Sequence, residues 1–193
     1  MSPARARTSD EAVIAAARRL LEEGGLEAVT MAAVAAKVGI RPPSLYKRFA
    51  DRQALIRAIG IDVFAELGEA LRGAETDPGA DRSAPRLRAM ARAYRQFGRS
   101  HPAAYGLLFT NLTADARPPV EAGAAATAPV LDVVGSLVGP KDALDATRLV
   151  AAFCHGFVSM ELAGAFRLGG DLDEAFGSAI DRLLESLSAR QAS

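Results

Sequence analysis

The sequence predicts an all-α fold of about nine helices. Apolar residues recur three and four positions apart along most of the chain, and no segment shows the strict alternation of a half-buried strand. Glycine and proline residues separate these periodic segments, as expected where helices end and turns begin. The first three helical patterns are expected to share a small three-helix core, ahead of a larger helical domain.

The N-terminal segment predicts an arm and one helix. Residues 1–8 carry two arginines, and we expect either a flexible basic arm or a frayed terminus. Thr8 and Glu11 then have the spacing of a capping box. The first helix is expected to run from this cap to about residue 23, because two glycines follow it. Its apolar positions are Val13, Ile14, Ala17, Leu20 and Leu21.

Residues 30–52 predict two short helices joined by a tight turn. Thr30 is a good N-cap, since its hydroxyl can accept a hydrogen bond from a free amide of the first turn. Gly39 follows the last apolar position of this helix, where a helix end favours positive φ. A Pro-Pro pair then suits the first turn of a second helix, expected over about residues 42–49. The segment therefore has the pattern of a helix-turn-helix.

Basic side chains are concentrated on this helix-turn-helix. Between Lys37 and Arg57 there are six basic residues and one acidic residue, whereas the whole chain has a net charge of zero. Such a patch is the electrostatic footprint of a partner with a phosphate backbone, although a solvated helix face would also be basic. If the second helix enters the major groove, residues near its start read bases and their neighbours contact phosphates. The base-reading candidates are Arg41, Ser44, Lys47 and Arg48, and the phosphate-contacting candidates are Thr30, Lys37, Tyr46 and Arg52.

A long run of residues matches a known pattern in register and without a gap. The matching residues are Val13-Ile14-Ala15-Ala16-Ala17, Gly25-Leu26-Glu27-Ala28-Val29-Thr30, Val34-Ala35, Val38-Gly39-Ile40, Ser44-Leu45-Tyr46, Phe49 and Leu55. With this run, residues 13–55 resemble the N-terminal DNA-binding domain of the TetR family of bacterial transcriptional regulators. The resemblance implies a homodimer that binds double-stranded DNA at a palindromic operator, acts as a repressor and is released by a small-molecule effector. Pro42 and Pro43 stand where small or polar residues are usual, so base readout is expected to depend on fewer contacts.

The domain boundary is expected inside a long fourth helix. This helix is predicted over residues 51–72, with its first half in a DNA-binding domain of residues 9–55 and its second half in a ligand-binding and dimerisation domain of residues 56–193. Proline, glycine, aspartate and serine residues mark residues 73–85 as a loop. The apolar stripe predicted along the fourth helix is Ala54, Leu55, Ala58, Ile61, Phe64 and Ala65.

Five more helices are expected after the loop, over about residues 87–98, 102–109, 119–138, 142–167 and 172–187. The helix of residues 142–167 is apolar on two opposite faces, and such a helix must be covered on both. One face is expected to pack in its own core and the other against a second copy of the chain. With the last helix it would form a four-helix bundle across the twofold axis of a homodimer, as the family resemblance also implies.

The C-terminal part carries aromatic residues ahead of a His-Pro, and a His-Gly followed by Met-Glu. These residues are Tyr94, Phe97, His101-Pro102, His155-Gly156 and Met160-Glu161. They resemble the "WHG" subgroup of TetR ligand domains, although the tryptophan usual before His-Gly is absent. We expect a mostly apolar effector pocket among the fourth to eighth helices, which favours a hydrophobic ligand, with plain core as the alternative role of the same residues. The candidate wall residues are Phe64, Met90, Tyr94, Phe97, Tyr105, Phe109, Phe153, Phe157 and Met160, with His155 and Glu161 as polar groups.

The residue inventory argues against an enzyme or a metalloprotein. Cys154 and His155 could serve as a nucleophile and a base, but adjacent residues on a helix point about 100° apart. Only two histidines and one cysteine occur, so we expect no metal site and no cofactor. The alternatives left open are a helical interaction module and a thiol-based sensor that uses Cys154, although a single cysteine on an apolar helix is more often inert packing. We find no apolar run near 18 residues and no signal-like leader, which favours a cytoplasmic location.

Overall fold

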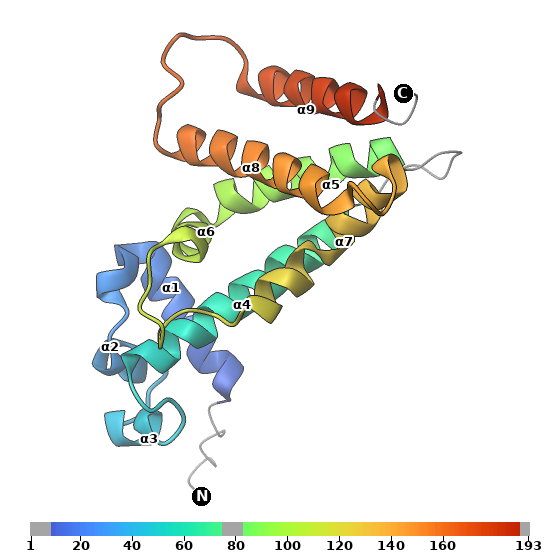
Figure 1. The fold of residues 1–193 in the computed structure, drawn as a ribbon. Coiled ribbons are helices and arrows are strands. Elements are labelled where there is room, and N and C mark those ends of the chain that lie inside the picture. The colour runs from blue at the N-terminus through green and yellow to red at the C-terminus, as the bar shows by residue number, and fades with distance from the viewer. Residues whose placement is uncertain (1–8, 75–82, 190–193) are drawn as a thin grey trace, which may run out of the picture. The chain divides into compact units, whose positions relative to one another are not determined.

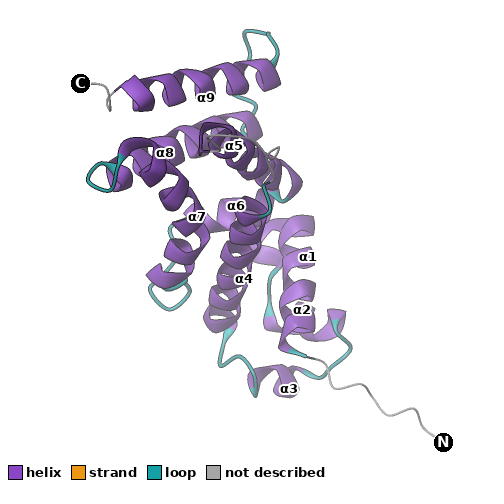
Figure 2. Cartoon of the chain, turned by 90° about the vertical axis from the view of Figure 1, so that its right-hand side faces the viewer, coloured by secondary structure: helices purple, strands orange, loops and turns teal. Residues whose placement is uncertain are grey.

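The computed structural model describes residues 9–74 and 83–189, and within these residues it contains helices and no strand (Figure 2). The all-α prediction is therefore confirmed for the described part of the chain. The predicted arm of residues 1–8 and most of the predicted loop lie outside the described residues. The helices are α1 (Asp10–Ala28), α2 (Met31–Lys37), α3 (Pro42–Tyr46), α4 (Arg52–Arg72), α5 (Ser83–Ser100), α6 (Pro102–Phe109), α7 (Val120–Val138), α8 (Ala143–Leu162) and α9 (Leu172–Ala189) (Figure 1).

Contacts divide the chain into two compact units. The first unit joins residues 1–64 with residues 101–122, and the second joins residues 65–100 with residues 123–193. The division falls within α4, and α6 groups with the helix-turn-helix although it follows α5 in sequence. The unit that holds the helix-turn-helix is therefore larger than the segment of residues 9–55 expected from the sequence.

In the first unit, α1 is tied to α6 by a side-chain cap. The carboxylate of Glu22 accepts hydrogen bonds from the backbone amides of Ala103 and Ala104, at 3.0 and 2.9 Å. These amides belong to the first turn of α6, where no intrahelical acceptor exists and an anion is favoured. The side chains buried in this unit include Val13, Ala16, Ala17, Leu21, Val29, Val34, Leu45, Leu55, Ile59 and Tyr105.

Two glycines divide α1 into a long regular helix and a short helical stretch. Gly24 has φ −146° and Gly25 has φ +70°, yet the chain returns to helical geometry and continues to Ala28. The predicted end of the first regular helix at residue 23 is therefore confirmed, whereas the short helical stretch after Gly25 was not predicted. Gly25 supplies the positive φ that a side chain would resist, and the short helical stretch after it is closed by the Val29 amide donating to the Leu26 carbonyl at 3.2 Å.

The buried stripe of α4 differs from the predicted one. Of the six predicted residues only Leu55 is buried, while Ile61 is 41 % exposed and Phe64 is half-buried. The helix buries its larger branched side chains, because each buried methylene stabilises the fold by about 0.8 kcal/mol. The predicted stripe contained three alanines, which would bury less apolar surface. The buried side chains are Leu55, Ile56, Ile59, Val63, Leu67 and Leu71.

Two helix ends in the second unit also differ from expectation. Helix α5 does not stop at residue 98 but continues to Ser100. Helix α8 ends at Leu162 instead of residue 167, because Gly164 has φ +61° and the Ala165 amide donates back to the Met160 carbonyl at 2.9 Å. This pattern is a Schellman motif, which closes the last carbonyls of a helix.

Helix α7 contradicts the expectation that no apolar run approaches 18 residues. By length and composition alone it could cross a membrane, with a mean hydropathy of 1.2 over its best window. A core helix of a soluble protein passes the same test, and one such helix is weak evidence for a span. In this structure 28 % of that window is buried inside the protein, including Ala126, Val133, Val134 and Leu137.

Candidate nucleic-acid interface and effector cavity

Helices α2 and α3 form the predicted helix-turn-helix. The hydroxyl of Thr30 caps α2 by accepting from the Ala33 amide at 3.1 Å. Gly39 has the predicted positive φ of +70°, and the Ile40 amide donates to the Ala35 carbonyl at 3.0 Å, which turns the chain toward α3. Helix α3 is shorter than the predicted residues 42–49, since regular helix ends at Tyr46 and a turn follows.

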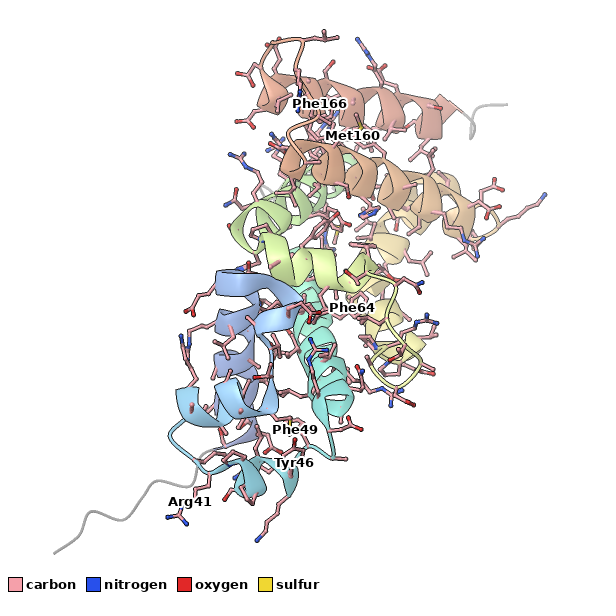
Figure 3. The ribbon with its side chains drawn as sticks, turned by 90° about the vertical axis from the view of Figure 1, so that its left-hand side faces the viewer. Arg41, Tyr46, Phe49, Phe64, Met160 and Phe166 are labelled. Atoms are coloured by element: carbon pink, nitrogen blue, oxygen red, sulfur yellow. The ribbon has the colours of Figure 1, made fainter. Side chains whose placement is uncertain are left out.

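The short helix α3 is held by its buried side and presents polar side chains on the other. Leu45 is fully buried and Phe49 is 9 % exposed, so both anchor the helix in the first unit. Tyr46 is 52 % exposed. Figure 3 shows the Arg41 side chain projecting away from the ribbon. The exposed residues of this segment are Arg41, Pro42, Pro43, Ser44, Tyr46, Lys47 and Arg48.

The basic side chains predicted to contact DNA differ in whether they already form ion pairs within the protein. Arg48 forms an ion pair with Asp10, and Lys37 forms one with Glu23 at 3.0 Å. Arg41 and Lys47 make no ion pair with any residue of the described segments. Their charges are therefore the ones most available to a phosphate or a base edge.

Arg52 has a structural role that the sequence did not reveal. Its Nε donates to the Val29 carbonyl at 2.7 Å and its Nη2 donates to the Leu26 carbonyl at 2.6 Å. These carbonyls lie at the connection between α1 and α2, so the guanidinium fixes the entry to the helix-turn-helix. The phosphate contact predicted for Arg52 stays a prediction. Its Nε and Nη2 already donate to backbone carbonyls.

The second unit contains an apolar cavity with a volume of about 50 Å³. Helices α4, α5, α7 and α8 line it, in agreement with a pocket among the fourth to eighth helices. Two threonine hydroxyls reach the wall, but each donates to a carbonyl of its own helix, as in Thr147 to Ala143 at 2.7 Å. The lining residues are Leu67, Leu71, Leu87, Met90, Ala91, Tyr94, Thr127, Val130, Thr147, Val150, Ala151 and Cys154.

Most of the predicted wall residues lie elsewhere. Only Met90 and Tyr94 line the cavity. Phe64, Tyr105 and Phe109 belong to the first unit, and Phe97 is buried without lining the cavity. Met160 is 48 % exposed (Figure 3), and Phe153 and Phe157 pack their rings against Phe176.

The two predicted polar groups of the pocket also have other surroundings. Glu161 forms a two-point ion pair with Arg95, with Nε–Oε2 and Nη2–Oε1 distances of 2.7 Å. His155 is half-buried with its Nδ1 3.4 Å from the Ser159 hydroxyl, and burial lowers its pKa. The cavity residues that we missed are aliphatic or small side chains at helical spacing, which a sequence cannot distinguish from ordinary core.

Cys154 is the one cavity residue with potential thiol chemistry. The side chain is 3 % exposed, and burial raises the pKa of its thiol to about 12. The reactive thiolate is therefore scarcer at neutral pH than for an exposed cysteine, and becomes abundant only as the pH approaches that value. We expect the folded protein at pH 8 to resist an aromatic disulfide reagent for hours, whereas denatured protein reacts at once. Rapid reaction of the folded protein would support the thiol-sensor alternative.

Metal binding finds no support in the described residues, 9–74 and 83–189. No group of three or more histidine, cysteine, aspartate and glutamate side chains in these segments could hold an ion.

Two family descriptions match this chain in sequence. Residues 13–59 match bacterial regulatory proteins of the TetR family, and residues 87–183 match the tetracycline repressor-like C-terminal domain. The second match alone spans half of the chain, and together the two cover the helix-turn-helix and all cavity-lining residues except Leu67 and Leu71. The chain belongs to the TetR family of bacterial transcriptional regulators. The finer resemblance to the "WHG" subgroup stays a prediction, because neither description names a subgroup.

Similar proteins cover nearly the whole chain. A protein called an uncharacterized HTH-type transcriptional regulator, Rv0681 of Mycobacterium tuberculosis, is 29 % identical over 96 % of this chain and 84 % of its own length. Another of that description, YobS of Bacillus subtilis, is 24 % identical over 97 % of this chain and 96 % of its own. A solved structure of a protein of unknown function from Rhodococcus sp. RHA1 superposes with a TM-score of 0.81, at 25 % identity, over 97 % of this chain and all of that one.

Proposed function

We propose that this TetR-family regulator is a cytoplasmic, homodimeric repressor that binds a palindromic operator and is released by a small, mostly apolar effector. The observation that supports operator binding most directly is the exposed side of α3. There Arg41 and Lys47 are free of ion pairs with described residues, while Leu45 anchors the helix from behind. An uncompensated positive surface on a rigid short helix suits the major groove.

Within this proposal, the exposed residues of α3 have separate tasks. Arg41 is the N-cap residue of α3, so its guanidinium can reach a base edge and contact guanine at two points. Ser44 and Lys47 face the same groove, and Tyr46 donates its hydroxyl to a phosphate. Arg48 can join them once DNA phosphates compete with Asp10 for its guanidinium. Thr30, Lys37 and Arg52 fix the position of the helix-turn-helix and add phosphate contacts at its edge.

Arg41→Ala is expected to relax sequence preference, and Tyr46→Ala is expected to weaken binding to every duplex alike. Losing a two-point contact to guanine reduces discrimination by about 1–3 kcal/mol, or roughly 5- to 150-fold in the ratio of specific to random affinity. Losing a phosphate contact leaves that ratio unchanged. Fluorescence anisotropy with an operator duplex and a random duplex measures both. Tyr46→Phe is the matched control for the ring, and equal losses on both duplexes for Arg41→Ala would contradict the assignment.

Homodimer formation is proposed through α8 and α9. Helix α8 buries Val150, Cys154 and Val158 in its own unit but leaves Leu149 and Met160 each 48 % exposed. Apolar side chains that a single chain leaves exposed on a core helix are suited to a second copy. The dimer then presents two α3 helices, which reach successive major grooves when they are about 34–36 Å apart.

Effector release is proposed to act through the size of the apolar cavity. Pockets for small organic molecules usually measure about 300–1,000 Å³, so a cavity of about 50 Å³ corresponds to a closed conformation. An effector that binds only an enlarged cavity shifts the population toward that state. Leu67 and Leu71 line the cavity from α4, and the same helix begins at Arg52 beside the helix-turn-helix. We infer that α4 transmits the change, and that DNA affinity falls by the differential affinity of the effector for the two states.

A further inference from the structure

The second unit has a hollow that is separate from the apolar cavity. It measures about 310 Å³ and is lined by α5 and the start of α9, with Arg92, Gln96 and Arg99 on one side and Asp173 and Phe176 on the other. It shares no residue with the apolar cavity and is several times larger. Its wall is rich in guanidinium groups, so its chemistry differs from that of a hydrophobic effector site.

One arginine of the hollow is already fully committed. Arg95 is 7 % exposed and donates to both carboxylate oxygens of Glu161 and to Asp173, all at 2.7 Å. Its guanidinium carbon also lies 5.4 and 5.2 Å from the ring centroids of Phe157 and Phe176. These contacts raise the pKa of Arg95, with the Glu161 hydrogen bonds as the largest cause. Arg95 therefore lines the hollow, but its positive charge is neutralised by Glu161 and Asp173, and its guanidinium is not available to a ligand.

The two remaining arginines are engaged weakly or not at all. The Arg99 side chain is 48 % exposed and lies 3.5 Å from Asp173 and 3.9 Å from Glu161, distances longer than a good hydrogen bond. Arg92 is exposed and makes no ion pair with a described residue. The two positions are seven residues apart, on the same face of α5 and about 10 Å apart along its axis. The amide of Gln96 lies between them in sequence.

We propose that this hollow binds a small organic anion that carries two or more carboxylate groups. Guanidinium groups recognise carboxylates through paired hydrogen bonds, and two guanidiniums on one face favour a ligand with more than one acidic group. The carboxylate of Asp173, itself a lining residue, already forms ion pairs with Arg95 and Arg99, and a ligand carboxylate could be bound by Arg99 in the same way. The volume of about 310 Å³ accommodates a di- or tricarboxylate.

Citrate is a suitable probe, titrated into the purified full-length protein by calorimetry with sodium chloride added to equalise the ionic strength. We expect saturable binding of one citrate per chain, at least tenfold weaker in Arg92→Gln/Arg99→Gln. Arg86→Gln, which removes an exposed charge on the same helix outside the hollow, should leave the affinity unchanged. Asp173→Asn should bind citrate severalfold more tightly, because the internal competitor for Arg99 is gone.

Two results would overturn the proposal. One is the absence of saturable citrate binding by the unaltered protein. The other is an equal loss in Arg86→Gln and in Arg92→Gln/Arg99→Gln, which would indicate general charge attraction. Because Arg86, Arg92 and Arg99 are exposed, Arg86→Gln and Arg92→Gln/Arg99→Gln should unfold thermally within a few degrees of the parent, and this scan accompanies each titration. Operator binding is not part of the readout, so the outcome is independent of the proposed repressor function.

Discussion

Glu161→Ala is expected to lower the free energy of unfolding by about 3–5 kcal/mol, the range for removing one partner of a buried ion pair. Arg95 and Glu161 have side chains only 8 % and 13 % exposed. Without Glu161, the charge of Arg95 would stay buried beside the rings of Phe157 and Phe176. Asp173 would be its remaining ion-pair partner. Since this cluster joins α5, α8 and α9, its loss should weaken the whole second unit.

Urea unfolding followed by circular dichroism measures this effect, at one fixed protein concentration because the proposed dimer would contribute to stability. Glu185→Ala removes an exposed carboxylate of α9 and should change stability by no more than about 0.5 kcal/mol. The double variant Arg95→Met/Glu161→Leu should recover much of the loss, because no unpaired charge remains buried. If Glu161→Ala is no more harmful than Glu185→Ala, the ion pair has no structural importance.

Leu45→Ala is expected to be the most damaging change in the helix-turn-helix. Leu45 is fully buried and is the only buried residue within α3. Leucine-to-alanine changes in a core reduce stability by about 2–5 kcal/mol. A helix of five residues has almost no stability of its own, so α3 depends on this anchor. We expect operator affinity to fall at least tenfold, while the cavity unit keeps its helical structure.

The controls separate the anchor from the DNA-reading surface. Leu45→Met conserves volume and should retain most of the stability and the affinity. Ser44→Ala, at the exposed neighbour, should leave urea unfolding unchanged and affect DNA binding alone. Operator affinity of Leu45→Ala equal to that of the parent would show that α3 is not held by this residue or does not read DNA.

The sequence predicted the helices well because their signals are local. Thr30 as an N-cap and Gly39 at positive φ are confirmed, since each depends on the backbone of its own turn. The errors arose where packing decided the outcome. Branched side chains such as Ile56 and Val63 occupy the buried stripe of α4 in place of the predicted alanines.

The sites were predicted unequally for the same reason. Leu45 and Phe49, four positions apart, mark the buried side of the α3 segment. The local sequence pattern was therefore sufficient to predict that Arg41, Ser44 and Lys47 are exposed. The cavity required knowledge of which helices meet, and large aromatic side chains misdirected the prediction toward residues outside it, such as the buried Phe97 and the exposed Phe109. The partners of Arg52 and Glu161 lie 23 and 66 positions away in sequence, and no local pattern predicts them.

The most direct test of the account is fluorescence anisotropy of the purified protein with the DNA flanking its own gene, beside a random duplex, at several salt concentrations. We predict tight and selective binding, in which the logarithm of the binding constant falls steeply and linearly with the logarithm of the salt concentration. The slope should be shallower in Lys37→Ala, because one proposed phosphate contact is lost. Weak and equal binding to both duplexes would contradict the proposal that α3 reads an operator there, and would favour a helical interaction module instead.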